Sequence, residues 1–376
     1  MSAAATGVTA LRALGWDHPR CMRPMRACAA AYTDRHPDVR VEWDARSLRR
    51  FGDEPLGQVA ARYDLLVIDH PFCGTAERDA TLLALDELVP AATMADLAAG
   101  SVGASHASYT FHGRQWGLAT DAACQVAAIR PDLLETPPAT WDDVRELAAS
   151  APGRVALPLA PPHAISSWLT LVAGRGGEPF HDPAAGGEAA AILAELARLG
   201  PAEALDWEPP DALGRMTETD TVAYIPLTYG YSTYSAGGGA RACRFVDIPE
   251  SGRGPVGAVL GGAGLAVSAA SRHPAEAAAF AAWTSGAEAQ RDVVAPNGGQ
   301  PAHRAAWDDP ALDALSGAFY SGTRATIDAA WVRPREAWWP GLQLAAGELL
   351  TAGLRRRTPA AEISDGLHEL FRRHSR

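Results

Sequence analysis

The sequence of 376 residues predicts an α/β protein in two lobes, each a mainly parallel sheet flanked by helices. Two observations support this prediction. The chain is too long for one ordinary hydrophobic core and suits two. Its first part also alternates strand and helix patterns: strands at 8–16, 38–43 and 63–69, and helices at 20–35 and 48–62. The last of these strands is a continuous apolar run, which is typical of a buried parallel strand.

The next segments predict a hairpin and then a hinge. Short helices are expected at 82–89 and 93–98, and a hairpin at 108–118 with its turn at His112-Gly113. The chain then passes through Thr120-Asp121 into a strand at 126–129, which we interpret as the crossing into the second lobe.

Later segments complete both lobes. Thr140 and Asp143 have the spacing of a capping box. Further helices are expected at 187–199, 213–219, 274–284, 287–293, 340–354 and 360–371, and a strand at 222–227. We expect lobe 1 to comprise 1–120 and about 266–325, and lobe 2 to comprise 121–265 and about 326–376 with the C-terminal helices.

Composition narrows the class of protein. The net charge is −11 and no predicted helix carries a basic stripe, so a nucleic-acid partner is not expected. No window is long and apolar enough to predict a membrane span. The first residues lack the pattern of a secretory signal, which predicts a cytoplasmic protein; a trimmed chain would instead be extracellular or lipid-anchored.

The five cysteines predict neither a metal site nor a disulfide framework. They do not form clusters of metal-binding spacing, and their odd number leaves at least one free. Cys21 and Cys28 would share one helix face, where buried thiols are common. We expect no metal and no cofactor.

Polar and aromatic residues follow several predicted strands. Because ligands of open α/β sheets bind beyond the carboxyl ends of strands, these loops are candidates for ligand binding. They contain Trp16, Asp17, His18, Asp69, His70, Thr120 and Asp121. Two simpler roles remain open: Asp17 could cap the following helix, and His70 could belong to a loop turn beside Pro71.

Several stretches together resemble one known family. They are HPDVRVEW (36–43), YDLLVIDHPF (63–72), GRQWGLATDA (113–122), PAEAAAFAAWTSGAEAQRDV (274–293) and PNGGQPAHRAAWDDP (296–310). Their order and spacing resemble family 1 extracellular solute-binding proteins, the sugar-binding subunits of ABC importers. The resemblance implies a periplasmic-binding-protein fold of type II that encloses a ligand in an inter-lobe cleft. It also implies importer membrane subunits as partners, if the protein is exported.

The 11 tryptophans favour a carbohydrate-like ligand, because aromatic rings stack on the apolar faces of sugars. We expect predicted loops to contribute Trp168, Tyr229, Tyr231, Gly262, Asn297, Trp331 and Arg333 to ligand binding. At most one of Trp338 and Trp339 should face a ligand, since they are adjacent, and Gly261–Gly264 should allow a close backbone approach. The chain contains no lysine, so its basic side chains are those of arginine. Arginines could bind a carboxylate, so a small organic acid is an alternative ligand.

An enzyme or sensor built on the same fold is the alternative. No nucleophile elbow or zinc-protease motif is present. In an enzyme, Asp17, His18, Asp69 and His70 would be the acid–base candidates, and Arg333 would steer an anion. A third reading is an interaction module whose cleft is filled by side chains.

Overall fold

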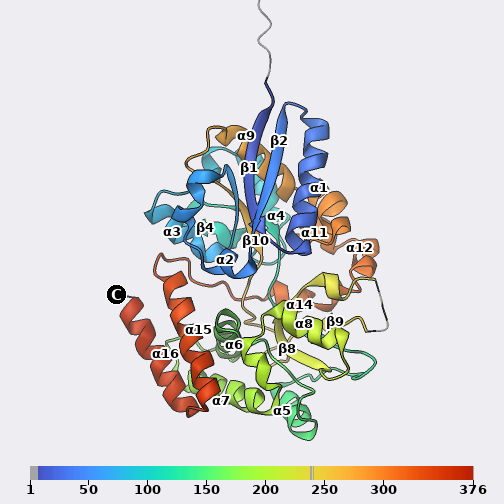
Figure 1. The fold of residues 1–376 in the computed structure, drawn as a ribbon, viewed down its shortest axis with the longest axis vertical. Coiled ribbons are helices and arrows are strands. Elements are labelled where there is room, and N and C mark those ends of the chain that lie inside the picture. Colours follow the sequence, from blue (N-terminus) through green and yellow to red (C-terminus); the bar gives the residue numbers. More distant parts are fainter. Residues whose placement is uncertain (1–6, 238, 240, 376) are drawn as a thin grey trace, which may run out of the picture. The chain divides into compact units, whose positions relative to one another are not determined.

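The computed structural model describes residues 7–237, 239 and 241–375 (Figure 1). The chain divides into two compact units. Unit 1 contains the chain up to Ala122 with Gly262–Leu312 and Pro334–Ala337, and unit 2 contains Ala123–Gly261, Asp313–Arg333 and the chain from Trp338 onward.

Unit 1 is built on a five-stranded sheet of order β2-β1-β3-β10-β6. β1 pairs in parallel with β2 and β3, whereas β10 is antiparallel to β3 and β6. The elements of the sheet and its helices are β1 (Thr9–Trp16), α1 (Pro19–Arg35), β2 (Val39–Arg46), α2 (Leu48–Asp53), β3 (Leu65–Ile68), α3 (Cys73–Arg78), α4 (Ala91–Ala99), β6 (Leu118–Asp121), β10 (Ala263–Val267), α9 (Pro274–Ser285), α10 (Ala287–Ala289), α11 (Arg304–Trp307) and α12 (Pro310–Leu315).

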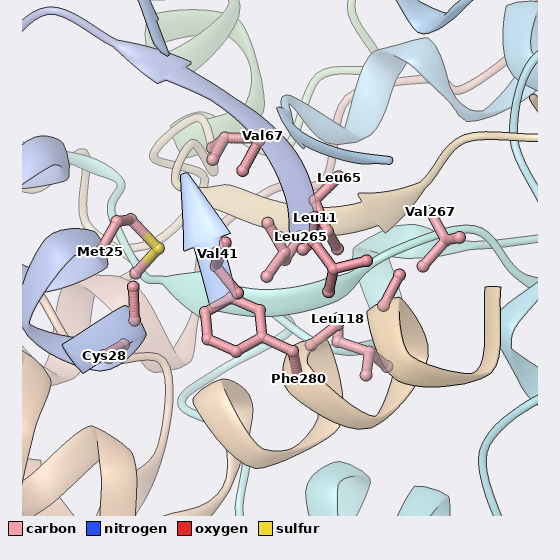
Figure 2. Close-up of a cluster of buried hydrophobic side chains, with 14 of the residues drawn as sticks. Leu11, Met25, Cys28, Val41, Leu65, Val67, Leu118, Leu265, Val267 and Phe280 are labelled. Atoms are coloured by element: carbon pink, nitrogen blue, oxygen red, sulfur yellow. The ribbon is translucent and has the colours of Figure 1, made fainter. Parts of the chain in front are cut away.

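One face of this sheet carries the core of unit 1. Alternate residues of the strands point to the same face, and α1 and α9 both cover it. On α1 the buried positions include Met25 and Cys28, and on α9 they include Phe280, whose ring meets Tyr32 edge-on at 5.2 Å. Figure 2 shows this cluster, with Leu11, Val41, Leu65, Val67, Leu118, Leu265 and Val267 contributed by the strands.

The predicted hairpin of unit 1 is confirmed. β4 (Thr110–Phe111) and β5 (Arg114–Gln115) pair antiparallel. The turn residues His112 and Gly113 both have positive φ, at 47° and 74°, as a two-residue type I′ turn requires.

Two helix predictions in unit 1 were wrong in extent. Instead of one helix over 48–62, α2 ends at Asp53, and Pro55 precedes two short 3₁₀ turns. The helix expected at 82–89 is only a 3₁₀ turn, Leu85–Glu87. A proline lacks the N–H that would continue the first helix, which explains its early end.

Unit 2 combines a small sheet with a group of helices. Its elements are β7 (Gln125–Ile129), α5 (Trp141–Ser150), α6 (Pro161–Gly174), α7 (Pro183–Leu199), α8 (Pro209–Glu218), β8 (Tyr224–Tyr229), β9 (Arg244–Val246), α13 (Phe319–Gly322), α14 (Arg324–Asp328), α15 (Trp339–Arg356) and α16 (Ala360–His374). Figure 1 shows α15 and α16 side by side, and these two pack against α6 and α7 respectively.

The sheet of unit 2 departs from the prediction of mainly parallel strands. Its order is β8-β7-β9, and β7 is antiparallel to both neighbours. Val155 adds a single parallel bridge to Tyr224. An apolar run reports that a strand is buried but not in which direction its neighbours run, so the sequence pattern could not reveal this arrangement.

Polar bonds attach α6 to the sheet of unit 2. Gln125 of β7 is fully buried; its Nε2 donates to Ser167 Oγ at 3.1 Å and its Oε1 accepts from Thr170 Oγ1 at 2.6 Å. Thr170 Oγ1 in turn accepts from the backbone N–H of Val259 at 2.9 Å. These bonds attach the middle of α6 to β7 and to the segment around Val259.

Candidate functional site

The carboxyl ends of three parallel strands form one edge of the unit 1 sheet. β1 ends at Trp16, β2 at Arg46 and β3 at Ile68. Trp16 and Arg46 are direct neighbours in the pairing, and the N–H of Asp17 donates to the Arg46 carbonyl at 2.7 Å. Asp69 follows β3 at the same edge, because neighbouring parallel strands end together. We call this set the strand-end edge.

Trp16 is packed in the core, and its one polar side-chain atom has no hydrogen-bond partner among the described residues. It is only 4% exposed, and its ring lies 5.0 Å from that of Phe51 in a tilted arrangement. Its indole Nε1 is buried and has no hydrogen-bond partner among the described residues. Asp17, the next residue, is exposed.

His18, rather than Asp17, caps α1. Its Nδ1 accepts from the backbone N–H of Arg20 at 3.1 Å, which makes His18 the N-cap. Burial and the nearby Arg20 charge lower the His18 pKa to about 4, so the ring is neutral near pH 7. The capping role considered for Asp17 was therefore wrong, and its carboxylate remains exposed beside the edge.

Asp69 and His70 form a turn. Asp69 caps the 3₁₀ turn His70–Phe72 through the His70 N–H, which donates to Asp69 Oδ1 at 2.9 Å. The His70 ring is fully buried, with Nδ1 3.3 Å from Asp69 Oδ1 and an edge-on contact with Tyr109. This arrangement matches the loop-turn alternative for His70.

Sequence reasoning missed an ion pair that holds Asp121. Arg20, 5% exposed, donates from Nε to Asp121 Oδ2 at 2.8 Å, and its Nη2 bonds Oδ1. Thr120 is also buried, with its hydroxyl 3.4 Å from the Ala263 carbonyl. Arg20 lies in the first turn of α1, four residues after Trp16. Its position just after the first predicted strand was the one sequence feature that could have indicated a role near Trp16.

A small cavity adjoins this ion pair within unit 1. Its volume is about 10 Å³, which is about the room that one water molecule or hydroxyl group needs. Polar and aromatic groups line one part of it and apolar groups the rest. The lining residues are Trp16, Arg20, Thr120, Asp121 and Gln300, with Cys21, Pro24, Met25, Val67, Val294 and Gly299.

In unit 2, Tyr229 gathers residues that lie far apart in the sequence. It is the last residue of β8, and its hydroxyl lies 3.3 Å from Ser166 Oγ of α6. The His163 ring of the same helix meets the Tyr229 ring edge-on at 6.0 Å. Gly261 lies against the Tyr229 ring, where a Cβ would come within 2.6 Å of a ring atom. We call Tyr229, His163, Ser166 and Gly261 the tyrosine platform.

His163 is neutral over the whole physiological range. Its Nδ1 is buried without a hydrogen-bond partner among the described residues, while part of the ring stays accessible. Burial, with a smaller effect from the Arg333 charge, lowers the His163 pKa to about 3. The sequence analysis did not select this residue, although it follows Pro161-Pro162 at a helix start.

Arg333 lies near the tyrosine platform, and its guanidinium already donates hydrogen bonds within the protein. It is 3% exposed; Nε donates to the Leu260 carbonyl at 3.2 Å and Nη1 to Gln343 Oε1 at 3.1 Å. Trp339 Nε1 donates to the same Gln343 oxygen at 3.1 Å. Trp331, half-buried, pairs through its backbone with the 258–260 segment.

The two adjacent tryptophans differ in burial. Trp339 is 1% exposed and belongs to the core of unit 2. Trp338 is partly exposed, with its ring 5.8 Å from that of Phe371.

Three predicted site residues lie outside both the strand-end edge and the tyrosine platform. Trp168 was predicted to lie in a loop, but it lies within α6. It is fully buried, and its Nε1 donates to the Gly186 carbonyl at 3.0 Å. Tyr231 is 4% exposed. Asn297 is exposed and its Nδ2 donates to the Val293 carbonyl at 2.8 Å.

Gly262 has a φ of 95°, which explains why a glycine stands there. The close backbone approach predicted for the glycine-rich stretch occurs at its neighbours Gly261 and Gly264, against the rings of Tyr229 and Tyr109.

The described residues contain no cluster of side chains suited to metal binding, and their cysteines form no disulfide. No group of three or more His, Cys, Asp or Glu side chains there could hold a metal ion. All five cysteines are free and buried. Burial raises the pKa of the Cys21 thiol, which lines the cavity, to about 12, so it remains protonated.

The comparisons with known proteins place the chain in a family. The profile of the family described as bacterial extracellular solute-binding protein matches residues 27–317. The chain belongs to this family. A search of curated proteins found no match.

Solved structures share the fold of this solute-binding protein at low sequence identity. Maltose-bound MalE3 of T. maritima has a TM-score of 0.82 at 18% identity, covering 96% of this chain and 99% of its own. The GacH receptor of Streptomyces glaucescens GLA.O, studied with acarbose, has a TM-score of 0.80 at 16% identity and covers 97% and 98%. An ABC transporter solute binding protein of Agrobacterium vitis S4, with bound D-mannitol, has a TM-score of 0.77 at 17% identity and covers 98% of each chain.

These likenesses confirm the predicted two-lobed solute-binding fold. None of the helices within the described residues combines the length and apolar character that crossing a bilayer needs.

Proposed function

We propose that this solute-binding protein binds a neutral polyhydroxylated ligand, a carbohydrate or a sugar alcohol, and delivers it to an ABC importer. The observation that carries the proposal is the strand-end edge, where the Nε1 of the buried Trp16 has no hydrogen-bond partner among the described residues and Asp17, with its exposed carboxylate, follows in sequence. A hydrogen-bond donor and a carboxylate acceptor are groups that can bind the hydroxyls of sugars and sugar alcohols.

The tyrosine platform supports the same ligand class. Its groups, the Tyr229 and Ser166 hydroxyls and the neutral imidazole of His163, carry no charge near pH 7. Neutral hydrogen-bonding groups suit hydroxyls better than carboxylates. The ligands named for the similar solved structures, maltose, acarbose and D-mannitol, belong to this class.

The importer partner follows from the family. A solute-binding protein that captures its ligand outside the membrane would hand it to the membrane subunits of an ABC importer. This location is part of the proposal, and fractionation of the native host cells tests it: the protein should be found outside the cytoplasm.

The central test is a ligand panel followed by two matched variants. Maltose, acarbose, D-mannitol and ribitol should be compared with small carboxylates by thermal shift and calorimetry. A neutral polyol at 100 times its dissociation constant should stabilise the protein by about 2.7 kcal/mol. Asp17→Ala should weaken binding about 10- to 100-fold, because a charged hydrogen-bond partner is lost.

The control is Asp34→Ala, near the other end of α1, where the carboxylate is also exposed. This variant should bind like the parent. Preference for carboxylates over every neutral polyol would contradict the proposed ligand class.

A further inference from the structure

Two residues that line the cavity beside Trp16 have hydrogen-bonding capacity to spare: Trp16 itself, as a donor, and Asp121, as a charged acceptor. The buried Trp16 Nε1 has no hydrogen-bond partner among the described residues, and Trp16 lines the cavity. A buried N–H without a partner is costly, because it has lost its bond to water. Such a cost is easily offset if a ligand or solvent atom accepts from this N–H.

Asp121 supplies acceptor capacity on the same cavity. A carboxylate can accept about four hydrogen bonds, and the described bonds to Asp121 are the two from Arg20. The ion pair is buried, with Arg20 5% and Asp121 7% exposed, so its geometry is held by the surrounding protein. Thr120 and Gln300 are fixed by bonds to the Ala263 and Ala122 carbonyls.

The size of the cavity limits what can enter. About 10 Å³ accommodates one oxygen atom with its hydrogens and no ring. The remaining lining is apolar, including Met25 and Val67, so a second polar atom would find few partners.

The Trp16 indole N–H and the Asp121 carboxylate together determine which kind of ligand atom can bind in the cavity. The indole N–H needs an acceptor, which an ammonium group cannot be. The Asp121 carboxylate repels a ligand carboxylate or phosphate, even though Arg20 offsets part of its charge. A hydroxyl can accept from Trp16 and donate to Asp121 at once.

We infer that this cavity is a hydroxyl subsite of the ligand-binding protein, in which one ligand hydroxyl accepts from Trp16 Nε1 and donates to Asp121. The inference rests on the proposed function and deepens it, because it requires a neutral hydroxylated ligand and assigns specificity to the indole N–H and to the Arg20–Asp121 pair. Trp16, whose ring is packed in the core, then acts through its N–H.

Trp16→Phe tests the inference, because it removes the N–H and keeps an aromatic ring. Trp43→Phe is the matched control: Trp43 is in the adjacent strand, its Nε1 is also buried without a partner among the described residues, and it does not line the cavity. Calorimetry should compare maltose, D-mannitol and ribitol with their monodeoxy derivatives. For one hydroxyl position, the parent should lose about 5- to 10-fold in affinity when that hydroxyl is absent.

The expected result is a loss of discrimination. Trp16→Phe should bind the hydroxylated and deoxy forms within about twofold, whereas Trp43→Phe should discriminate like the parent. In a spectrum of ¹⁵N-labelled indole groups, the resonance that is missing in Trp16→Phe should shift on ligand addition. Unchanged discrimination in Trp16→Phe, or an unmoved resonance at ligand saturation, would overturn the inference.

Failure of the proposed function gives a different result. If no sugar or polyol binds the parent, the proposed ligand class fails, and a high-resolution crystal structure of the unliganded protein decides on the subsite. A water bonded to both Trp16 Nε1 and Asp121 supports a site for one oxygen atom with donor and acceptor. A cavity without that water contradicts it.

Discussion

In unit 1 the candidate residues follow the ends of neighbouring parallel strands, whereas in unit 2 they come from a helix start, a strand end and a glycine turn. The first arrangement can be read from order along the chain, since strand ends of a parallel sheet share an edge. The second depends on how α6 and β8 pack. The comparison teaches that order along the chain located the first set, and that folding assembled the second.

The two sets also differ in how they hold charge. In unit 1, around the cavity that Trp16 also lines, a buried carboxylate and a buried guanidinium, Asp121 and Arg20, neutralise one another. The tyrosine platform uses neutral groups and keeps His163 uncharged. The following variants test this difference, beginning with the largest expected effect.

Asp121→Ala should destabilise the protein by about 3–5 kcal/mol, because it leaves the buried Arg20 charge without its carboxylate. Urea unfolding measures this change. Glu288→Ala breaks an ion pair of the same unit with Arg35, but both side chains are about half exposed, so it should cost less than about 1 kcal/mol. Equal effects of the two variants would contradict the importance of the buried pair.

Gly261→Ala should destabilise by about 1–3 kcal/mol, because its Cβ would come within 2.6 Å of the Tyr229 ring and displace it. Ligand affinity should fall as well, since the ring belongs to the platform. Gly187→Ala in α7 is the control; no atom outside its immediate surroundings lies within 4 Å of its Cβ, and it should stabilise by up to about 1 kcal/mol. A Gly261→Ala protein with parental stability would show that the ring has room to move.

His163 predicts an acid-sensitive fold. Its folded-state pKa, about 3, lies below its unfolded value of about 6.5. The unfolded chain therefore binds more protons between these values, and stability falls as the pH drops from about 6.5 toward 3. His163→Gln should lose less stability than the parent between pH 7 and pH 4 in urea titrations. Identical pH profiles for His163→Gln and the parent would exclude this contribution.

Tyr229→Phe should have the smallest effect on folding, below about 1 kcal/mol, and should weaken ligand binding about 3- to 10-fold by calorimetry. It removes the hydroxyl that meets Ser166 and keeps the ring on Gly261. Trp168→Phe is the opposite case: it loses the bond to Gly186 and should cost stability without changing affinity. Loss of affinity in Trp168→Phe at full stability would show that this buried tryptophan does influence the ligand.

The candidate site was predicted only in part, and the reasons lie in particular residues. The positions of Trp16 and Asp69 follow from apolar strands that end at polar residues. Trp168 was misplaced because its helix, α6, is buried on nearly every side and shows little of the usual periodicity. Arg20 and His163 were missed because an ordinary helix-start position does not reveal a partner, Asp121 or Tyr229, far along the chain.

By itself, the sequence determined the alternation of strands and helices in unit 1, the hairpin turn at His112-Gly113 and the capping box at Thr140. These features depend on local periodicity and backbone preference, which each segment carries with it. The tertiary structure alone decided the strand directions in unit 2, the burial of His70 and the pairing of Arg20 with Asp121. Those outcomes depend on which distant segments exclude water from a side chain, and on the charges they place beside it.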